Sequence, residues 1–270
     1  MRKLFLAAAV LMSAGSAHAA DLAYKAPVVA APVPTWTGWY VGVNGGGTWN
    51  RIDTNARDVG PDGFFALANQ AAVVAGATQT FDGTGGLFGG QVGYLYQTGR
   101  AIWGVEAGFD WSGLRASTSN GPTVYPVTPG SAFAWNLQAK QDWLFTLLGR
   151  VGIDAGNWYP YLTGGLAVTH EKYSANFLDT FYPTNNTFTF GGTTAGWALG
   201  AGAEYRVSDH WLLRGEYLYM EFDGLGGNGL ISCNSPGVPN CAAGGNTAVF
   251  SFGTSKFRDN VGRLALSYKF

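Results

Sequence analysis

The chain has 270 residues and a formal net charge of −1, so neither a basic nucleic-acid-binding surface nor an acidic tail is indicated. Charged residues make up only 12% of it, about half the share of a typical soluble domain, whereas aromatic residues reach 15% and 41 residues are Gly. Too few charges remain to cover a soluble surface. Because residues 20–270 contain no apolar run of about 18 residues, helical membrane spans are also excluded. A transmembrane β-barrel is the class that remains.

The amino-terminal segment has the pattern of an export signal. Arg2 and Lys3 precede a short apolar run, and Ala17-His18-Ala19 is the small-x-small pattern that a signal peptidase accepts. We therefore expect residues 1–19 to be a cleaved signal peptide, since the run is too short to cross ~30 Å of hydrocarbon as a helix. Residues 20–35, rich in Pro and Ala, are expected to form an extended periplasmic leader.

Eight segments between Trp36 and Phe270 alternate apolar and polar residues, as strands with two unlike faces do. In the third segment Trp103, Val105 and Phe109 alternate with Glu106 and Asp110. The eight segments are 37–50, 87–97, 101–111, 143–154, 159–171, 195–206, 211–222 and 259–270.

The connections between these segments alternate in length. Three are short, with the sequences TGR, AGN and VSD, and four are long, covering roughly residues 51–85, 113–138, 172–193 and 224–255. Outer-membrane barrels have short periplasmic turns and long extracellular loops. The sequence therefore predicts an all-β fold over residues 36–270: an eight-stranded antiparallel up-and-down transmembrane barrel with four long, mobile extracellular loops.

Two other all-β folds are weighed against this prediction. A soluble barrel of the lipocalin type would turn its apolar residues inward around a ligand, and a secreted β-sandwich would also contain seven or more strands. Five Trp residues near strand ends suit the aromatic belts of a membrane barrel better than a ligand cup. The regular alternation of loop length disfavours the sandwich. The five are Trp103, Trp111, Trp143, Trp197 and Trp211.

If the apolar faces meet lipid, the polar faces meet inside the barrel. Eight strands leave room only for side chains, and isolated charges there would be costly, so opposite charges must pair. We expect a network of Arg–carboxylate pairs that plugs the lumen, with a gate for small solutes as the alternative. Its members are Glu106, Asp110, Arg150, Glu204, Arg214, Glu216 and Arg263.

Catalysis, cofactors and metal sites are not indicated. His170 and Glu171 are adjacent in a strand segment, so their side chains point to opposite faces and cannot form a catalytic triad with Ser174 unless the chain turns there. Cys233 and Cys241 favour a disulfide that closes a small loop, because the chain carries an export signal, with free thiols as the alternative.

Several stretches together resemble the small outer-membrane surface antigens, a family also called outer membrane immunogenic or porin family proteins. They are AADLAYKAP, WTGWYVGVNGGG, GWALGAGAEYRVSDHWLLRGEYLYMEF and RLALSYKF. The resemblance implies an OmpA-like eight-stranded barrel in the bacterial outer membrane, surface loops seen by host or phage, and no catalytic residues. It also implies insertion by the barrel assembly machinery through a signal that maps onto Leu264, Leu266, Tyr268 and Phe270.

The expected function is accordingly that of a structural outer-membrane barrel and surface antigen, with limited diffusion of small solutes through a narrow porin as the alternative. The expected partners are outer-membrane lipid, lipopolysaccharide and the assembly machinery, and no nucleic acid.

Overall fold

The computed structural model describes residues 35–58, 65–182, 184–232 and 247–270. Within these ranges it contains ten strands and one helix. In chain order they are β1 (Gly38–Asp58), α1 (Leu67–Ala77), β2 (Thr80–Thr98), β3 (Ala101–Ser112), β4 (Arg115–Val124), β5 (Ala132–Ile153), β6 (Trp158–Asp179), β7 (Thr184–Arg206), β8 (Trp211–Asp223), β9 (Gly226–Ser232) and β10 (Thr247–Lys269). The expected signal peptide, all of the expected leader except Thr35, and both cysteines lie outside the described residues.

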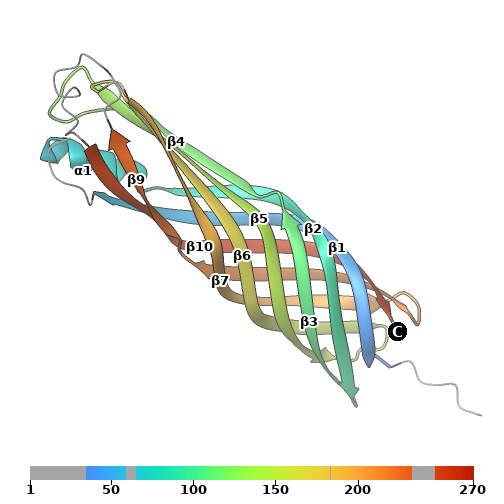
Figure 1. Cartoon of the computed structure of the whole chain (residues 1–270). Coiled ribbons are helices and arrows are strands. Elements are labelled where there is room, and N and C mark those ends of the chain that lie inside the picture. Colours follow the sequence, from blue (N-terminus) through green and yellow to red (C-terminus); the bar gives the residue numbers. More distant parts are fainter. Residues whose placement is uncertain (1–34, 59–64, 183, 233–246) are drawn as a thin grey trace, which may run out of the picture. The chain divides into compact units, whose positions relative to one another are not determined.

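Eight of these strands close into one antiparallel ring (Figure 1). Its order is β1, β2, β3, β5, β6, β7, β8 and β10. The ring closes because β1 pairs with both β2 and β10, so that Tyr40 lies opposite Gly93 on one side and Lys269 on the other. The prediction of an eight-stranded barrel is confirmed, and the closed ring excludes a two-sheet sandwich. Closure leaves no ring strand with an unpaired edge at this level.

Short turns join the ring strands at one end, as the sequence predicts. Gly99 lies in the turn between β2 and β3, and Gly156 lies in the turn between β5 and β6. Both adopt a positive φ, 60° and 80°, a conformation that residues with a Cβ atom rarely adopt. Glycine at these two positions therefore permits the tight reversals.

The outer surface of the ring is apolar. Two belts of exposed large side chains surround it, one near the short turns and one about ten residues further along the strands, the spacing expected of a membrane-spanning strand. The belt near the turns includes Trp39, Tyr96, Trp103, Trp158 and Trp211, and the second belt includes Trp49, Phe88, Trp111 and Trp197. A lipocalin-like barrel would place such residues inside, so that alternative is wrong.

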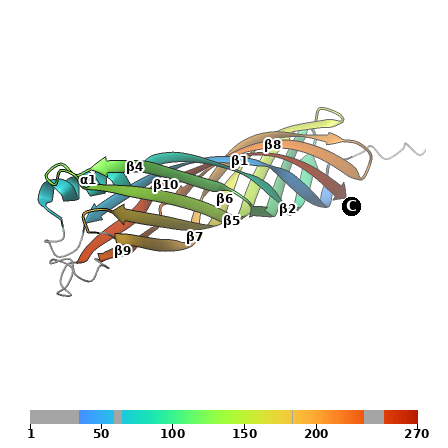
Figure 2. The same ribbon diagram turned by 90° about the horizontal axis from the view of Figure 1, so that it is seen from above.

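The sequence predicts long, mobile loops, but these connections contain strands and a helix (Figure 2). Several ring strands continue past the second belt for many residues. There β4 pairs with β5 and β9 pairs with β10, so both add to the sheet beyond the ring. We call this part of the barrel the distal extension. Within the described ranges, no helix is long and apolar enough to cross a membrane.

Helix α1 packs across the inside of the distal extension. Its buried residues Asn69, Val73 and Ala77 recur every four positions and so share one face. Trp135 on β5 donates a 3.0 Å hydrogen bond from Nε1 to the carbonyl oxygen of Val73. The extension therefore encloses an apolar core, in which the aromatic rings of Trp135 and Phe177 lie 4.7 Å apart.

A second, smaller apolar cluster lies inside the ring near the short turns. It is formed by Trp36, Tyr40, Leu95, Ile102, Tyr159, Tyr161 and Leu212. The interior of the barrel thus has apolar clusters towards both ends, and the charged residues of the strands lie between them.

Candidate functional site

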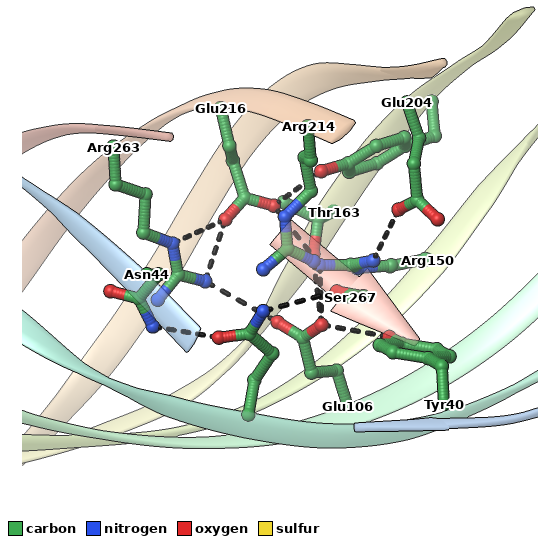
Figure 3. Close-up of polar contacts among 12 residues, drawn as sticks. Tyr40, Asn44, Glu106, Arg150, Thr163, Glu204, Arg214, Glu216, Arg263 and Ser267 are labelled. Carbon is green, nitrogen blue, oxygen red and sulfur yellow. Dashed lines mark hydrogen bonds and ion pairs between the residues drawn. The ribbon is translucent and has the colours of Figure 1, made fainter. Parts of the chain in front are cut away.

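Among the charged side chains inside the ring, seven form one connected group, each with 0% to 6% of its surface exposed. They are the seven expected from the sequence to lie inside the barrel: Glu106, Asp110, Arg150, Glu204, Arg214, Glu216 and Arg263. They come from five strands, β3, β5, β7, β8 and β10. Figure 3 shows six of them converging in the lumen, and Asp110, which it does not label, joins them through Arg263. We call this group the charged layer.

Glu106 on β3 is the most heavily contacted carboxylate of the charged layer. Its Oε2 lies 2.7 Å from Arg150 Nη2 and 2.6 Å from Arg214 Nη1. The hydroxyl of Tyr40 donates a 2.7 Å hydrogen bond to the same oxygen, and Arg263 Nη2 lies 3.4 Å from Oε1. Three guanidinium groups and one hydroxyl therefore compensate a single buried negative charge.

Glu216 on β8 is a second centre of the layer. Arg263 contacts its Oε2 through both Nη2 at 2.6 Å and Nε at 2.7 Å. Tyr161 donates a 2.7 Å hydrogen bond to Oε1, and Arg150 Nη2 lies 3.4 Å from the same oxygen. Contacts from β10, β6 and β5 to a carboxylate on β8 cross the lumen rather than join neighbouring strands only.

The remaining carboxylates are held at the edges of the layer. Arg150 Nη1 lies 3.5 Å from Glu204, and Arg263 Nη1 lies 3.3 Å from Asp110. The guanidinium of Arg150 also lies over the ring of Tyr161, 4.7 Å from its centroid, a favourable cation–π distance. Arg150 therefore contacts three carboxylates and one aromatic face.

A chain of neutral polar side chains borders the charged layer. Asn44 donates a 2.8 Å hydrogen bond to Gln91 Oε1, and Gln91 Nε2 donates a 3.2 Å bond to Ser267 (Figure 3 labels Asn44 and Ser267). These contacts join β1, β2 and β10 where the ring closes. Such side chains satisfy polar groups that a packed lumen removes from water.

A second polar layer lies between the charged layer and the distal extension, and the sequence reasoning missed it. Asp259 accepts hydrogen bonds from Thr48 and, at 3.3 Å, from Gln141, while Glu171 accepts one from Tyr173. The alternation of the sequence indicates this position, because Asp259 lies four residues before Arg263 and so shares its inward face of β10. The same alternation places Glu171 inward, two residues after the buried Thr169.

The structure does not assemble a hydrolytic site around His170. Its ring stacks on Trp143 on the outside of the barrel, with centroids 6.2 Å apart, whereas Glu171 is buried inside. Within the described ranges, no group of three or more His, Cys, Asp or Glu side chains is placed to hold a metal ion. His170 is therefore a polar residue of the outer belt.

The four residues assigned to an assembly signal form one exposed row. Three of them lie on β10, and Phe270 directly follows it. All four point outward, with exposed fractions from 37% to 72%: Leu264, Leu266, Tyr268 and Phe270. The backbone nitrogen of Phe270 donates a 2.9 Å hydrogen bond to the carbonyl oxygen of Trp39 at the closure of the ring. Recognition of this row during assembly stays a prediction.

A polar cluster fixes the turn between β5 and β6 to the start of β1. Asp154 is partly desolvated, which raises its pKa, but three hydrogen bonds outweigh this and hold the pKa below its usual range. They come from Trp36 Nε1 at 3.2 Å, from the Gly156 backbone nitrogen at 2.9 Å and from Gln97 Nε2 at 2.8 Å.

Comparisons with known proteins identify similar sequences and structures. Residues 6–270 match the family model described as an outer membrane protein beta-barrel domain. The chain is 32% identical to the 31 kDa outer-membrane immunogenic protein of Brucella melitensis over the whole of both chains. It is 29% identical to a 22 kDa outer membrane protein of Rhizobium leguminosarum, over 74% of this chain and 70% of the relative. The solved structure of OprG from Pseudomonas aeruginosa covers 87% of this chain and is itself covered to 96%, at 15% identity and a TM-score of 0.36.

Proposed function

Because the chain belongs to the family of outer-membrane proteins with a β-barrel domain, we propose that it is a structural, surface-exposed barrel whose lumen is closed by paired charges. Its location is the outer membrane, as that of its relatives is. The barrel's role there is structural: it forms a stable element of the outer membrane and presents its distal extension outside.

The charged layer carries this proposal. Its members are almost fully buried, and Arg150 alone reaches carboxylates on β3, β7 and β8. Side chains from opposite walls therefore meet across the lumen, which supports closure of the barrel at that level. Opening such a path would separate buried ion pairs, and breaking one typically costs about 3–5 kcal/mol.

The apolar clusters at both sides support the same conclusion. The cluster around Trp36 and Tyr159 lies towards the short turns, and α1 with its aromatic neighbours fills the distal extension. A permeating solute would have to pass three packed layers in succession.

The surface role rests on the distal extension and on the relatives. The strands of the extension continue well past the second aromatic belt, so they project beyond the membrane on the side away from the short turns. Relatives from Brucella are named immunogenic outer-membrane proteins. We propose that the extension is the part of this chain that host factors, phage or antibodies contact, and that the barrel has no catalytic activity.

A narrow porin is the second candidate, and one observation favours it. Arg150 lies within 2.7 Å to 3.5 Å of three carboxylates, so exchange between partners could occur without leaving the guanidinium unpaired. Such an exchange would open a path only if the apolar cluster of the extension also rearranged.

Solute entry into proteoliposomes tests these candidates. We expect vesicles with the folded wild-type protein to admit small sugars and amino acids no faster than protein-free vesicles. The Glu106→Ala and Arg150→Ala variants serve as opened controls, and a heat-modifiability gel verifies that each preparation is folded. Rapid entry through the wild type that either variant alters would refute closure and favour the porin.

A further inference from the structure

Three cations lie side by side on the outside of the barrel, just beyond the second aromatic belt. Arg115 on β4 is directly opposite Lys140 on β5, and Lys140 is directly opposite Lys172 on β6. All three side chains are exposed. Directly opposed residues of an antiparallel pair lie about 5 Å apart, and like charges in such positions are destabilising. A row of three therefore calls for a counter-charge.

The protein supplies only part of that counter-charge. Asp142, at a bulge in β5, lies 2.6 Å from Lys172 Nζ. In the part of the chain that the structure describes, neither Arg115 nor Lys140 has an ion-pair partner. On the far side of the ring two outward cations are paired, since Lys256 lies 2.5 Å from Glu221 and Arg258 lies 3.2 Å from Asp53. Arg115 and Lys140 therefore leave positive charge in the row that no ion pair of the described residues compensates.

The height of the row places it at lipid headgroups. Arg115 follows the belt residue Trp111 by four positions, and Lys172 follows His170, which stacks on Trp143, by two. A strand rises about 3.3 Å per residue and is tilted by about 45° in membrane barrels. The cations therefore lie roughly 5–10 Å beyond the belt that marks the edge of the hydrocarbon.

The surface beside the row is hollowed and polar. Arg115, Ser117, Gln138 and Lys140 line a groove of about 270 Å³ between β4 and β5. Ser117 and Gln138 lie directly opposite each other, one step beyond the two cations, and both are exposed. A guanidinium, an ammonium, a hydroxyl and an amide at one groove are donors suited to a phosphate group.

From this arrangement we propose that Arg115, Lys140 and Lys172 form a binding site for the phosphate groups of the outer-leaflet glycolipid, lipopolysaccharide. The lipid is the occupant because the row faces outward at headgroup height, beside an apolar wall that contacts its acyl chains. Two cations without acidic partners attract the phosphate, and the groove seats it. This inference rests on the membrane location and not on closure of the lumen, so the two can fail separately.

The test measures binding of diphosphorylated lipid A to the folded protein in neutral detergent. The Arg115→Gln/Lys140→Gln/Lys172→Gln variant is compared with Lys256→Gln, which removes an exposed but paired cation of the same barrel. We expect a roughly tenfold to hundredfold loss of affinity in the triple variant, since each cation near an anionic membrane surface adds about a factor of five. Lys256→Gln should stay within about twofold of wild type.

Two further arms identify the source of the phosphate. Dephosphorylated lipid A should bind wild type as weakly as diphosphorylated lipid A binds the triple variant, and inorganic phosphate should compete only weakly. The proposed site would be refuted if wild type and the triple variant bound diphosphorylated lipid A with equal affinity. Equal losses of affinity in the triple variant and in Lys256→Gln would refute it too. If inorganic phosphate binds as tightly as lipid A, the occupant is a soluble anion and the lipid assignment is wrong. Heat-modifiability gels establish that every variant is folded.

Discussion

Removing Arg263 tests the energetic role of the charged layer. Its guanidinium contacts Glu216 at 2.6 Å, Asp110 at 3.3 Å and Glu106 at 3.4 Å. In Arg263→Met the new side chain fills much of the same volume, so the main effect is electrostatic. Glu106 and Glu216 keep Arg150, but Asp110 loses the one ion pair that the described residues provide for it.

The expected loss follows from this count of partners. The layer changes from four carboxylates and three guanidiniums to four and two, so its formal charge changes from −1 to −2. Removing one partner of a buried ion pair typically costs about 3–5 kcal/mol, and we expect Arg263→Met to fall in that range. Adding Asp110→Asn should restore about 1–2 kcal/mol, because it removes the carboxylate that Arg263→Met leaves without an ion pair.

Urea unfolding of the protein folded in phospholipid vesicles provides the free energies. The matched control is Arg258→Met, five residues away on the same strand, where ion pairs of 3.2 Å and 3.3 Å are partly exposed to solvent. Exposed pairs contribute about 0–1 kcal/mol, so this variant should unfold almost as wild type does. Equal, small losses for the two variants would refute the view that the charged layer is a tightly paired buried network.

Three further predictions concern packing, the turn cluster and assembly. A Cβ atom at Gly93 would lie 2.3 Å from the Tyr40 hydroxyl, so Gly93→Val should destabilise the barrel by about 1–3 kcal/mol in the same unfolding assay. The control is the outward Gly149→Val, which should not destabilise it, because the atom nearest to a Cβ there would be 3.7 Å away. Because the pKa of Asp154 is lowered in the fold, its contribution to stability is present at neutral pH and is lost as pH falls through the folded-state pKa. The difference in urea midpoint between wild type and Asp154→Asn should therefore shrink on acidification, and a difference independent of pH would contradict this role. Phe270→Ser should lower outer-membrane levels, measured by membrane fractionation, far more than Leu199→Ser, an equally outward position on β7; equal levels would remove Phe270 from the assembly signal.

Strand alternation made the ring and the charged layer accessible from the sequence. A charged residue is expected to point inward when it lies an odd number of positions from outward residues of its strand, such as Trp103 and Trp111. The short turns between segments indicate the antiparallel order of the strands. This alternation does not predict which inward charges contact one another across the lumen. The contact between Arg263 on β10 and Asp110 on β3 depends on the stagger of the whole barrel, a property of all eight strands together.

The distal extension was harder to predict for a local reason. Residues 132–140 alternate Phe133, Trp135, Leu137 and Ala139 inward, but Pro126, Pro129 and Gly130 just before them favour a loop. Helix α1 is similarly obscured, because its Ala-rich segment has few large apolar residues to mark a periodic face. Both elements are stabilised by each other, through contacts such as the hydrogen bond from Trp135 to Val73, rather than by local preference.

Planar-bilayer recording of the refolded wild-type protein tests the central claim, closure of the lumen, most directly. Arg258→Met serves as a variant with an intact charged layer, and Arg150→Ala as one in which the layer is opened. With the lumen closed, wild type and Arg258→Met should leave the bilayer current at the level of a protein-free membrane. A stable, stepwise current through the wild type that Arg150→Ala changes would contradict closure.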